Sequence, residues 1–438
     1  MLNQKEIKSV SSEYISTSSA HKTADSSDNA LPWYREVGSA GWAALLLAGL
    51  GWMFESYDSF MLSLTLPTLA TVFDLSKTQI GALISVTAAG QICGGVLFGW
   101  VSDRLGRVRT AYLCILIYSI FSGLIAFAPS ISVIAALRFC GALGMGGTWT
   151  AGAALVAETW GAKHRGRGGA LMQMGLPIGA IVAIGAAAVV GNLAGGLGGN
   201  GWRILYLIGA LPAVIMFFIA RRTPESPVWK KRAQASLLKT RRRFSLPSAA
   251  ELKGIKHAFF FIFFLQYIFW GVFTWAPTFL IASKHLNFLH SLNFLMALQL
   301  GAIAGFIVFG SFVDRFGRRP LFFSYLGIGI CSVCCYVLSV QPGILLVALF
   351  FTGFSVNGIF AGLGPFTAEL IPDTESRAFL MGLAYNGGRI GGLLAPSIIG
   401  VLATHGGAEL GMSTTIAAFA FAAVVIFFAP ETKGRQLK

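Results

Sequence analysis

The chain has 438 residues, of which 55% are hydrophobic and 12% are charged, and its mean hydropathy is +0.70. About a quarter of the residues of a soluble globular protein are charged, so this composition excludes an ordinary soluble domain and indicates a membrane protein. A formal charge of +15 would suggest a nucleic-acid partner for a soluble chain, but here the basic residues have another explanation.

Residues 1–38 form the first segment. They are rich in Ser and other polar residues and contain no apolar stretch long enough to enter a bilayer. We therefore expect a disordered cytoplasmic tail and no cleavable signal peptide.

The rest of the chain alternates between apolar runs and short polar loops. A bilayer-spanning helix needs about 20 residues, and runs of that length lie at 40–64, 78–101, 110–128, 132–157, 168–190 and 202–220, and again at 257–282, 293–313, 321–340, 343–368, 378–403 and 411–429. This pattern predicts an all-α integral membrane protein with 12 transmembrane helices in two pseudo-symmetric six-helix bundles. The predicted bundles are 39–220 and 257–430, joined by a basic cytoplasmic linker, 221–256, and followed by a cytoplasmic tail, 431–438.

The positions of the Lys and Arg residues favour one orientation in the membrane. With both termini in the cytoplasm, the inner loops and the C-terminal tail hold 24 of them, whereas the outer loops hold only Lys77, Arg203 and Lys284. This bias agrees with the positive-inside rule. The positive charge is thus explained by topology, with attraction to anionic lipids as a further effect, and no nucleic-acid partner is expected.

One motif occurs twice, as GWVSDRLGRVR at 99–109 and GSFVDRFGRRP at 310–320, so its first glycines are 211 residues apart. Each copy ends one apolar run and begins another, which indicates two equivalent halves. Asp103 and Asp314 lie at predicted helix ends beside arginines and can pair with them or with the start of a neighbouring helix. Such pairs can hold an inner gate closed in one state; the alternative is that these loop charges only set the topology. Val108 replaces the second arginine in the first copy, so the two latches need not be equally strong.

Four charged residues lie well inside the predicted spans: Glu55, Asp58, Arg138 and Arg389. Because a charge at membrane depth is costly, each is a candidate functional residue. Glu55 and Asp58 share a helix face and are candidates for proton coupling, whereas the two arginines are candidates to bind a carboxylate. Asp58 and Arg138 have matching depths, so the alternative for this pair is a permanent structural ion pair.

Neutral polar residues in the spans could line a cavity, although for each one alone helix–helix contact is the commoner role. The candidates for substrate binding are Gln266, Tyr267, Gln299, Asn357 and Tyr385. No metal-ligand spacing and no phosphate-binding loop for ATP are present. We therefore expect no cofactor and no metal, with the proton gradient as the energy source.

The repeated motif resembles the loop 2–3 and loop 8–9 signatures of the major facilitator superfamily. Further similarities are RFCGALGMGGTW at 138–149, AETWGAKHRGRGGALMQ at 157–173, PESPVW at 224–229, AELIPDTESRAF at 368–379, YNGGRIGGLLAP at 385–396 and PETKG at 430–434. The resemblance covers residues 40–434 and is greatest to the sialate/lactate and aromatic-acid carboxylate:proton symporters. It implies gating roles for Gly99, Asp103, Arg104, Gly106, Arg107, Glu158, Arg165, Gly310, Asp314, Arg315, Gly317, Arg318, Glu369 and Arg377.

Two sites depart from that branch. The fourth span reads Gly146-Gly147-Thr148-Trp149, where the branch commonly has Glu in place of Thr148. If that Glu carries protons in relatives, coupling here uses another group or is absent. The first span reads Phe54-Glu55-Ser56-Tyr57-Asp58, with an acid spacing that differs from the usual one.

These features together predict a secondary transporter that imports a small organic anion, a monocarboxylate or aromatic acid, with protons by alternating access. We expect a monomer in the bilayer of a bacterial inner membrane, with both termini cytoplasmic and no enzymatic activity. The alternatives are a neutral sugar or polyol porter, which PESPVW and PETKG favour, and an exporter of drugs or aromatic compounds. A non-transporting membrane sensor is a more remote alternative.

Overall fold

The computed structural model describes residues 32–75, 77–193, 197, 199–237, 249–282, 288–339, 341–371 and 377–435. The chain divides into two compact units, Met1–Gly38 and Ser39–Lys438. The first unit contains the short helix α2 (Trp33–Glu36). The tail predicted to be disordered lies for the most part outside the described residues.

The second unit begins with the helices of the N-terminal half. These are α3 (Gly38–Val72), α4 (Lys77–Leu105), α5 (Arg107–Ile125), α6 (Ile131–Thr159), α7 (Arg165–Gln173), α8 (Gly175–Leu193), α9 (Gly201–Ile208) and α10 (Leu211–Arg222). The fifth and sixth predicted spans are each made of two helices, α7 with α8 and α9 with α10. Pro212 lies in the first turn of α10, and because proline has no backbone N–H it interrupts the helical hydrogen bonds there.

A short helix, α11 (Pro227–Leu237), lies in the region predicted as linker and precedes the C-terminal half. That half consists of α12 (Ala249–Ala282), α13 (Phe288–Phe316), α14 (Arg318–Leu338), α15 (Pro342–Leu370) and α16 (Arg377–Phe428). Among the described residues, nine helices are long and apolar enough to cross a membrane. The other three predicted spans lie in α3, in α4 and in the first part of α16.

Helix α16 contains both of the last two predicted spans. A straight helix of its 52 residues would be about 78 Å long, more than twice the thickness of the hydrocarbon core. The chain instead turns back between Ile399 and Gly411. A Cβ added at Gly411 would lie 2.7 Å from the carbonyl oxygen of Ile399, although twelve residues of straight helix would separate the two residues by about 18 Å. Gly407, with a φ of +81°, lies between these two residues.

Equivalent glycines let helices pack closely in both halves. A Cβ added at Gly94 of α4 would lie 1.9 Å from the carbonyl oxygen of Leu143, and one added at Gly305 of α13 would lie 2.1 Å from that of Phe354. Both residues of the second contact are 211 positions after those of the first, the spacing of the repeated motif. Small residues permit such close backbone approach in membranes, and the repetition shows that the two six-helix bundles are pseudo-symmetric.

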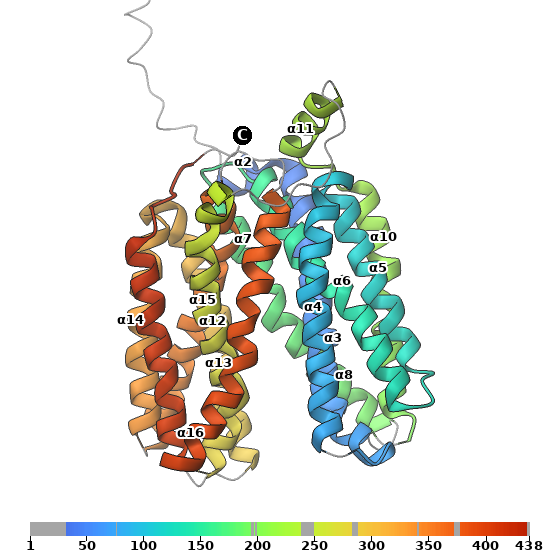
Figure 1. Cartoon of the computed structure of the whole chain (residues 1–438), viewed down its shortest axis with the longest axis vertical. Coiled ribbons are helices and arrows are strands. Elements are labelled where there is room, and N and C mark those ends of the chain that lie inside the picture. The colour runs from blue at the N-terminus through green and yellow to red at the C-terminus, as the bar shows by residue number, and fades with distance from the viewer. Residues whose placement is uncertain are drawn as a thin grey trace, which may run out of the picture. The chain divides into compact units, whose positions relative to one another are not determined.

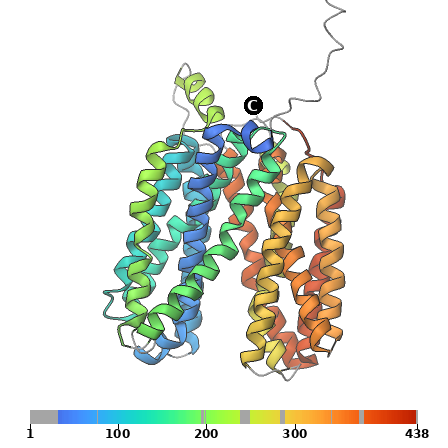
Figure 2. The same ribbon diagram turned by 180° about the vertical axis from the view of Figure 1, so that it is seen from behind.

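The two bundles meet at one end. In Figures 1 and 2 their helices come together at the end where α11 lies, and the ribbons diverge toward the opposite end. Asp103 and Asp314 both lie at this end, which we call the motif end. The contact between α4 and α16 includes Gly99, whose added Cβ would lie 2.9 Å from the carbonyl oxygen of Ala378. The contact between α7 and α13 includes Gly310, whose added Cβ would lie 2.5 Å from the Cβ of Ala170.

Candidate functional site

The four charged residues predicted inside the spans form two groups. The first lies within the N-terminal half, where Arg138 of α6 donates to Asp58 of α3 through Nη1 at 2.5 Å and to the Asp58 carbonyl oxygen through Nη2 at 3.4 Å. Ser122 of α5 donates a hydrogen bond to the other carboxylate oxygen. Asp58 and Arg138 are both buried. The pairing that their equal depth suggested is therefore present, and these partners all belong to one bundle.

The second group joins the two bundles. Arg389 of α16 faces Glu55, about midway along α3, with 3.7 Å between Arg389 Nη2 and Glu55 Oε1. This distance exceeds that of a hydrogen bond. Among the described residues, Glu55 Oε2 and Arg389 Nη1 are buried without a hydrogen-bond partner. The pair thus has unused hydrogen-bonding capacity on both sides, whereas in the pair formed by Asp58 and Arg138 both carboxylate oxygens are bonded and Arg138 Nε is the described atom without a partner.

Aromatic rings surround this second group. Tyr385 precedes Arg389 by one turn of α16, and the Arg389 guanidinium carbon lies 5.5 Å from the centre of its ring. Trp149 of α6 stacks on Tyr385 with ring centres 3.6 Å apart and planes 12° apart. Trp52 of α3 contacts Tyr385 edge-on at 6.5 Å. We call these five residues, Trp52, Glu55, Trp149, Tyr385 and Arg389, the central site.

The neutral polar candidates divide into those near the central site and those apart from it. Gln266 is buried and lies close to the Tyr385 hydroxyl group. In contrast, Tyr267 donates to Thr414 Oγ1 at 2.9 Å, and Asn357 donates to the carbonyl oxygen of Gly353 in its own helix at 3.1 Å. Gln299 of α13 is partly buried. Gln266 and Tyr385 of this set are thus brought together near Arg389.

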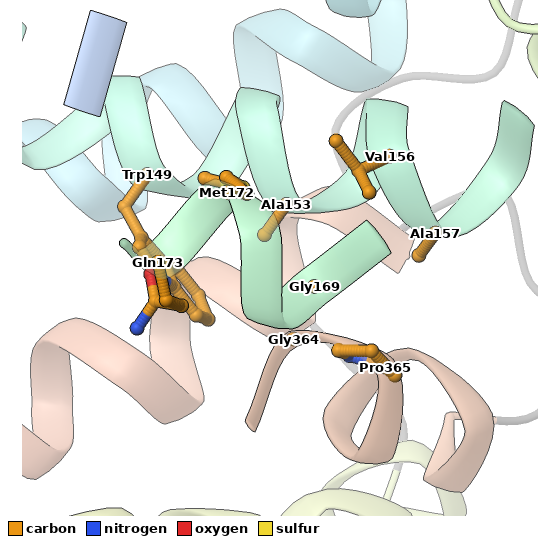
Figure 3. A pocket seen from close by; sticks show the side chains of 9 residues that line it. All are labelled: Trp149, Ala153, Val156, Ala157, Gly169, Met172, Gln173, Gly364 and Pro365. Atoms are coloured by element: carbon orange, nitrogen blue, oxygen red, sulfur yellow. The ribbon is translucent and has the colours of Figure 1, made fainter. Parts of the chain in front are cut away.

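A small cavity of about 10 Å³ lies beside the Trp149 ring. Trp149 and Gln173 lie at one end of it, and Ala157 and Pro365 lie at the other (Figure 3). Gln173 of α7 accepts from Trp149 Nε1 at 3.0 Å and donates to the carbonyl oxygen of Phe360 at 3.3 Å. Its amide therefore holds the Trp149 ring in place and also contacts the other bundle.

At the motif end, Arg107 organises the charged residues of the N-terminal half. It donates to Asp103 at 2.8 Å and to both carboxylate oxygens of Glu158 at 3.1 and 3.0 Å. Ser226 also donates to Glu158, at 2.5 Å, and Glu225 accepts from the backbone N–H of Arg107 at 2.9 Å. The segment after α10 thus completes this network and caps α5.

The C-terminal half repeats the network. Arg318 donates to Asp314 at 3.1 Å and to both carboxylate oxygens of Glu369 at 3.1 and 2.9 Å. Thr432 donates to Glu369 at 2.6 Å, and Glu431 accepts from the backbone N–H of Arg318 at 3.0 Å. Each member has its counterpart in the first half, so the repeated motif builds the same arrangement twice.

Both networks reach the opposite bundle. Asp103 accepts from the backbone N–H groups of Ala378 and Phe379, at 3.1 and 2.9 Å, at the beginning of α16. Likewise Asp314 accepts from Gly166 and Arg167, both at 2.9 Å, at the beginning of α7. A carboxylate at a helix N-terminus is favoured by the unpaired N–H groups and by the helix dipole.

Two arginines add ion pairs across the same interface. Arg165 Nη1 lies 3.0 Å from Glu369, and Arg377 Nη1 lies 3.6 Å from Glu158. The first is reinforced by the tail, because Arg165 also donates to the carbonyl oxygen of Arg435 at 2.8 Å. The interface at the motif end is therefore held by charge-assisted hydrogen bonds from both sides.

Two predicted gate residues lie outside the network. Arg104 and Arg315 are exposed, and their guanidinium carbons lie 3.9 Å from the ring centre of Trp100 and 5.5 Å from that of Phe316. Each immediately follows an aspartate, so its side chain is rotated by about 100° around the helix from that of the aspartate.

The glycines Gly106 and Gly317 have φ of +102° and +99°, a conformation that other residues rarely adopt. They separate α4 from α5 and α13 from α14. This break exposes the first backbone N–H groups of α5 and α14, to which Glu225 and Glu431 bind. Arg319 adds one bond that Val108 cannot make, from Nη2 to the carbonyl oxygen of Phe427 at 2.7 Å, but this bond stays within the C-terminal half.

Glu431 shows how strongly such a cap holds a charge. Burial acts to raise the pKa of its carboxyl group, but the backbone N–H groups of Arg318, Arg319, Lys433 and Thr432 outweigh burial and lower the pKa below its ordinary value. Hydrogen bonds to the ionised form have this effect on a carboxylate.

Sequence reasoning did not select several residues of these sites. Glu225, Ser226, Glu431 and Thr432 lie in the PESP and PETK segments, which were noted only as similarities. Trp149 was noted only as part of the span 4 motif, and its glycine-rich surroundings were the available signal for close packing.

Comparisons with known proteins agree with this architecture. The sequence matches the model of the Major Facilitator Superfamily over residues 42–344 and 294–438. The cis,cis-muconate transport protein of Acinetobacter baylyi is 30% identical, over 89% of this chain and 94% of its own length. The niacin transporter NiaP of the same species is 28% identical, over 92% of this chain and 97% of its own length.

Among solved structures, the proton:xylose symporter XylE from E. coli superimposes with a TM-score of 0.75, covering 91% of this chain and 98% of XylE at 20% sequence identity. At that identity the likeness concerns the fold alone.

Proposed function

Because this chain belongs to the Major Facilitator Superfamily, we propose that it imports a small organic anion together with protons by alternating access. Its family and fold make it a multi-pass membrane transporter and not an enzyme. The anion, the proton and the direction of transport are the parts that we propose.

The observation that carries this proposal is the incompletely paired Arg389 at the interface of the bundles. A guanidinium group offers a planar fork of donors that matches a carboxylate. Arg389 lies 3.7 Å from Glu55 and keeps Nη1 without a partner among the described residues. Its side chain is 13% exposed, against 4% for that of Glu55, so Arg389 is the more accessible of the two. A substrate carboxylate can therefore bind Arg389 where Glu55 does not.

The same geometry supports coupling to a proton. When a substrate carboxylate takes Arg389, the buried Glu55 loses its positive neighbour. A buried carboxylate without a partner is costly, and taking up a proton removes that cost. The anion and the proton therefore bind together, and we assign the proton to Glu55.

Asp58 and Arg138 suit this role less well than sequence reasoning suggested. Both carboxylate oxygens of Asp58 are bonded, by Ser122 and by Arg138, and all three residues lie in the N-terminal half. A pair within one bundle stays intact when the bundles move relative to each other. We propose that it fixes α3 against α5 and α6.

Thr148, which occupies the position of the missing Glu, lies close to the central site. Its hydroxyl group donates to the carbonyl oxygen of Gly144 at 3.0 Å, and its methyl carbon would lie 3.4 Å from a Cβ added at Gly51 of α3. Gly51 precedes Glu55 by one helical turn. The acid that relatives place on the fourth span is therefore replaced, in our proposal, by one that α3 supplies nearby.

We further propose that the motif end faces the cytoplasm, as the positive-inside rule favours, and that the monomer functions in the inner membrane without a cofactor. The charged networks then close the cytoplasmic side while the bundles diverge toward the outside. The names of the two relatives support an anionic cargo, since cis,cis-muconate and niacin are both carboxylic acids.

The experiment is counterflow of labelled compounds into proteoliposomes that contain the full chain. We expect exchange of a carboxylate such as nicotinate or cis,cis-muconate, and no exchange of xylose. Arg389→Gln should abolish carboxylate exchange, and Arg389→Lys should restore only part of it because the fork is lost. Arg109→Gln, which removes the same charge at an exposed position, serves as the control and should retain carboxylate exchange. Exchange of xylose without exchange of any carboxylate would refute the proposal.

A further inference from the structure

The ring stack of Trp149 and Tyr385 is the feature of the central site that binding of a carboxylate and a proton leaves unexplained. The two rings come from opposite bundles, α6 and α16, and both residues are at most 2% exposed. No contact of this kind is needed to hold the motif end, where the ion pairs lie. The stack is also adjacent to Arg389, whose guanidinium carbon is 5.5 Å from the Tyr385 ring centre.

The geometry of the stack is not the one that aromatic pairs prefer. Ring centres 3.6 Å apart with planes 12° apart leave almost no lateral offset, since carbon atoms pack at about 3.5–4.0 Å. Offset and edge-to-face pairs are favoured over this face-to-face arrangement, because the negative ring faces repel. The surroundings therefore hold the rings together. The Gln173 amide fixes Trp149 at 3.0 Å, and Tyr385 is placed by the packing of α16.

The stack lies between Arg389 and the small cavity, because Tyr385 is beside Arg389 and Trp149 lines the cavity. Along α6, Trp149 is followed toward the motif end by Ala153 and Ala157, which line the small cavity with Gly169 and Gly364 (Figure 3). The lining comes from both bundles and also includes larger side chains such as Met172. Because Trp149 belongs to α6 and Tyr385 to α16, a movement of one bundle relative to the other can part the two rings.

We propose that Trp149 and Tyr385 are specificity-determining residues, and that they part to hold the flat, conjugated body of the anion whose carboxylate Arg389 binds. This inference rests on the proposed function. An inserted planar group replaces one contact of the less favoured face-to-face geometry with two stacking contacts that can adopt the offset geometry. A saturated ring of the same carbon count is puckered and lacks the π-system, so it gains less.

The test compares two acids that differ only in this property, benzoate and cyclohexanecarboxylate, as competitors of labelled carboxylate counterflow, with protein-free liposomes subtracted. We expect the wild-type protein to prefer benzoate by about fivefold to tenfold in apparent affinity. Trp149→Leu and Tyr385→Leu should each reduce that ratio toward one, because each removes one of the two stacking faces and so weakens competition by benzoate more than competition by cyclohexanecarboxylate. Trp149→Phe and Tyr385→Phe should retain it, and so should Trp270→Leu, which removes a Trp that is 46% exposed on α12.

The outcomes separate the inference from the proposed function. A wild-type ratio near one, or a ratio that both Leu variants leave unchanged, overturns the inference and leaves anion transport intact. Exchange of neutral sugars without exchange of any carboxylate refutes the proposed function and the inference with it. If one Leu variant fails to insert into the membrane, the other decides, because either ring alone leaves only one stacking face.

Discussion

Removing Arg165 should shift the protein toward a state that is open at the motif end. This side chain crosses the interface with two bonds, to Glu369 at 3.0 Å and to the carbonyl oxygen of Arg435 at 2.8 Å. Glu369 keeps Arg318 and Thr432 as partners when Arg165 is lost, so the C-terminal half remains satisfied. The N-terminal half loses the bond from Arg165 Nε to the carbonyl oxygen of Ala157, at 2.7 Å, whereas the interface loses two bonds. The change therefore acts on the contact between the bundles more than on the folding of either one.

The expected magnitude follows from these bonds. A hydrogen bond to a charged group contributes about 1.5–3 kcal/mol and one to a carbonyl about 1 kcal/mol. Allowing for partial replacement by water and by the shorter side chain, Arg165→Gln should cost the closed state about 2 kcal/mol. That changes the ratio of open to closed molecules by roughly 30-fold.

Spin labels can report this ratio. Leu105 and Phe316 occupy equivalent positions at the ends of α4 and α13 and are 47% and 53% exposed, so Cys substitutions there accept labels on opposite bundles. Pulsed electron–electron double resonance should show that a larger fraction of Arg165→Gln molecules has a long distance between the two labels. Arg109→Gln, with the same loss of charge at an exposed site, should not change it. An unchanged distribution in Arg165→Gln would show that this ion pair does not hold the bundles together.

Three further predictions concern stability and the interface. Because the pKa of Glu431 is lowered in the folded protein, its charge stabilises the fold above the ordinary carboxyl pKa, and this stabilisation is lost as the pH falls through the lowered value, below about 4.3. The Tm of Glu431→Gln should therefore be lower than that of wild type at pH 7, and the two should converge in acid. A difference in Tm that does not change with pH would contradict the role of the Glu431 charge in capping α14. Asp58→Asn leaves a buried Arg138 without its counter-charge and should destabilise the protein by about 3–5 kcal/mol, seen as a lowered Tm in detergent; an unchanged Tm would contradict a structural pair. Gly99→Ala would place a Cβ 2.9 Å from a carbonyl oxygen of α16 and should lengthen the distance between the same spin labels, whereas Gly161→Ala, with nothing within 4 Å, should not; equal distances in both variants would exclude the close approach.

The architecture could be predicted from the sequence because membranes impose a simple length rule. Apolar runs of about 20 residues give the spans, and the spacing of 211 residues between motif copies gives the two halves. The pairing of Asp58 with Arg138 could also be predicted, because both are near the same end of oppositely directed spans. The sequence gives the position of a residue along its helix, and therefore its depth in the membrane. It does not give the rotation of the helix about its axis, which decides the neighbour that a side chain faces.

Rotation is the reason that other contacts escaped prediction. Arg104 belongs to the predicted gate motif, but the arginine that contacts Asp103 is Arg107, from the next helix beyond the break at Gly106. Arg104 instead lies over the Trp100 ring. The contact of Glu55 with Arg389 and the stack of Trp149 on Tyr385 depend on how two bundles meet. Nothing in either half alone specifies that interface, so these contacts required the folded structure.

The central claim, that Glu55 carries the proton that accompanies an anion bound at Arg389, is tested most directly by proton entry into proteoliposomes loaded with a pH-sensitive dye. Addition of a transported carboxylate such as nicotinate should acidify the interior of wild-type vesicles beyond protein-free liposomes. Glu55→Gln should abolish this acidification while labelled nicotinate still exchanges by counterflow. If the interior of vesicles that contain the Glu55→Gln variant acidified as much as that of wild-type vesicles, the account would be contradicted.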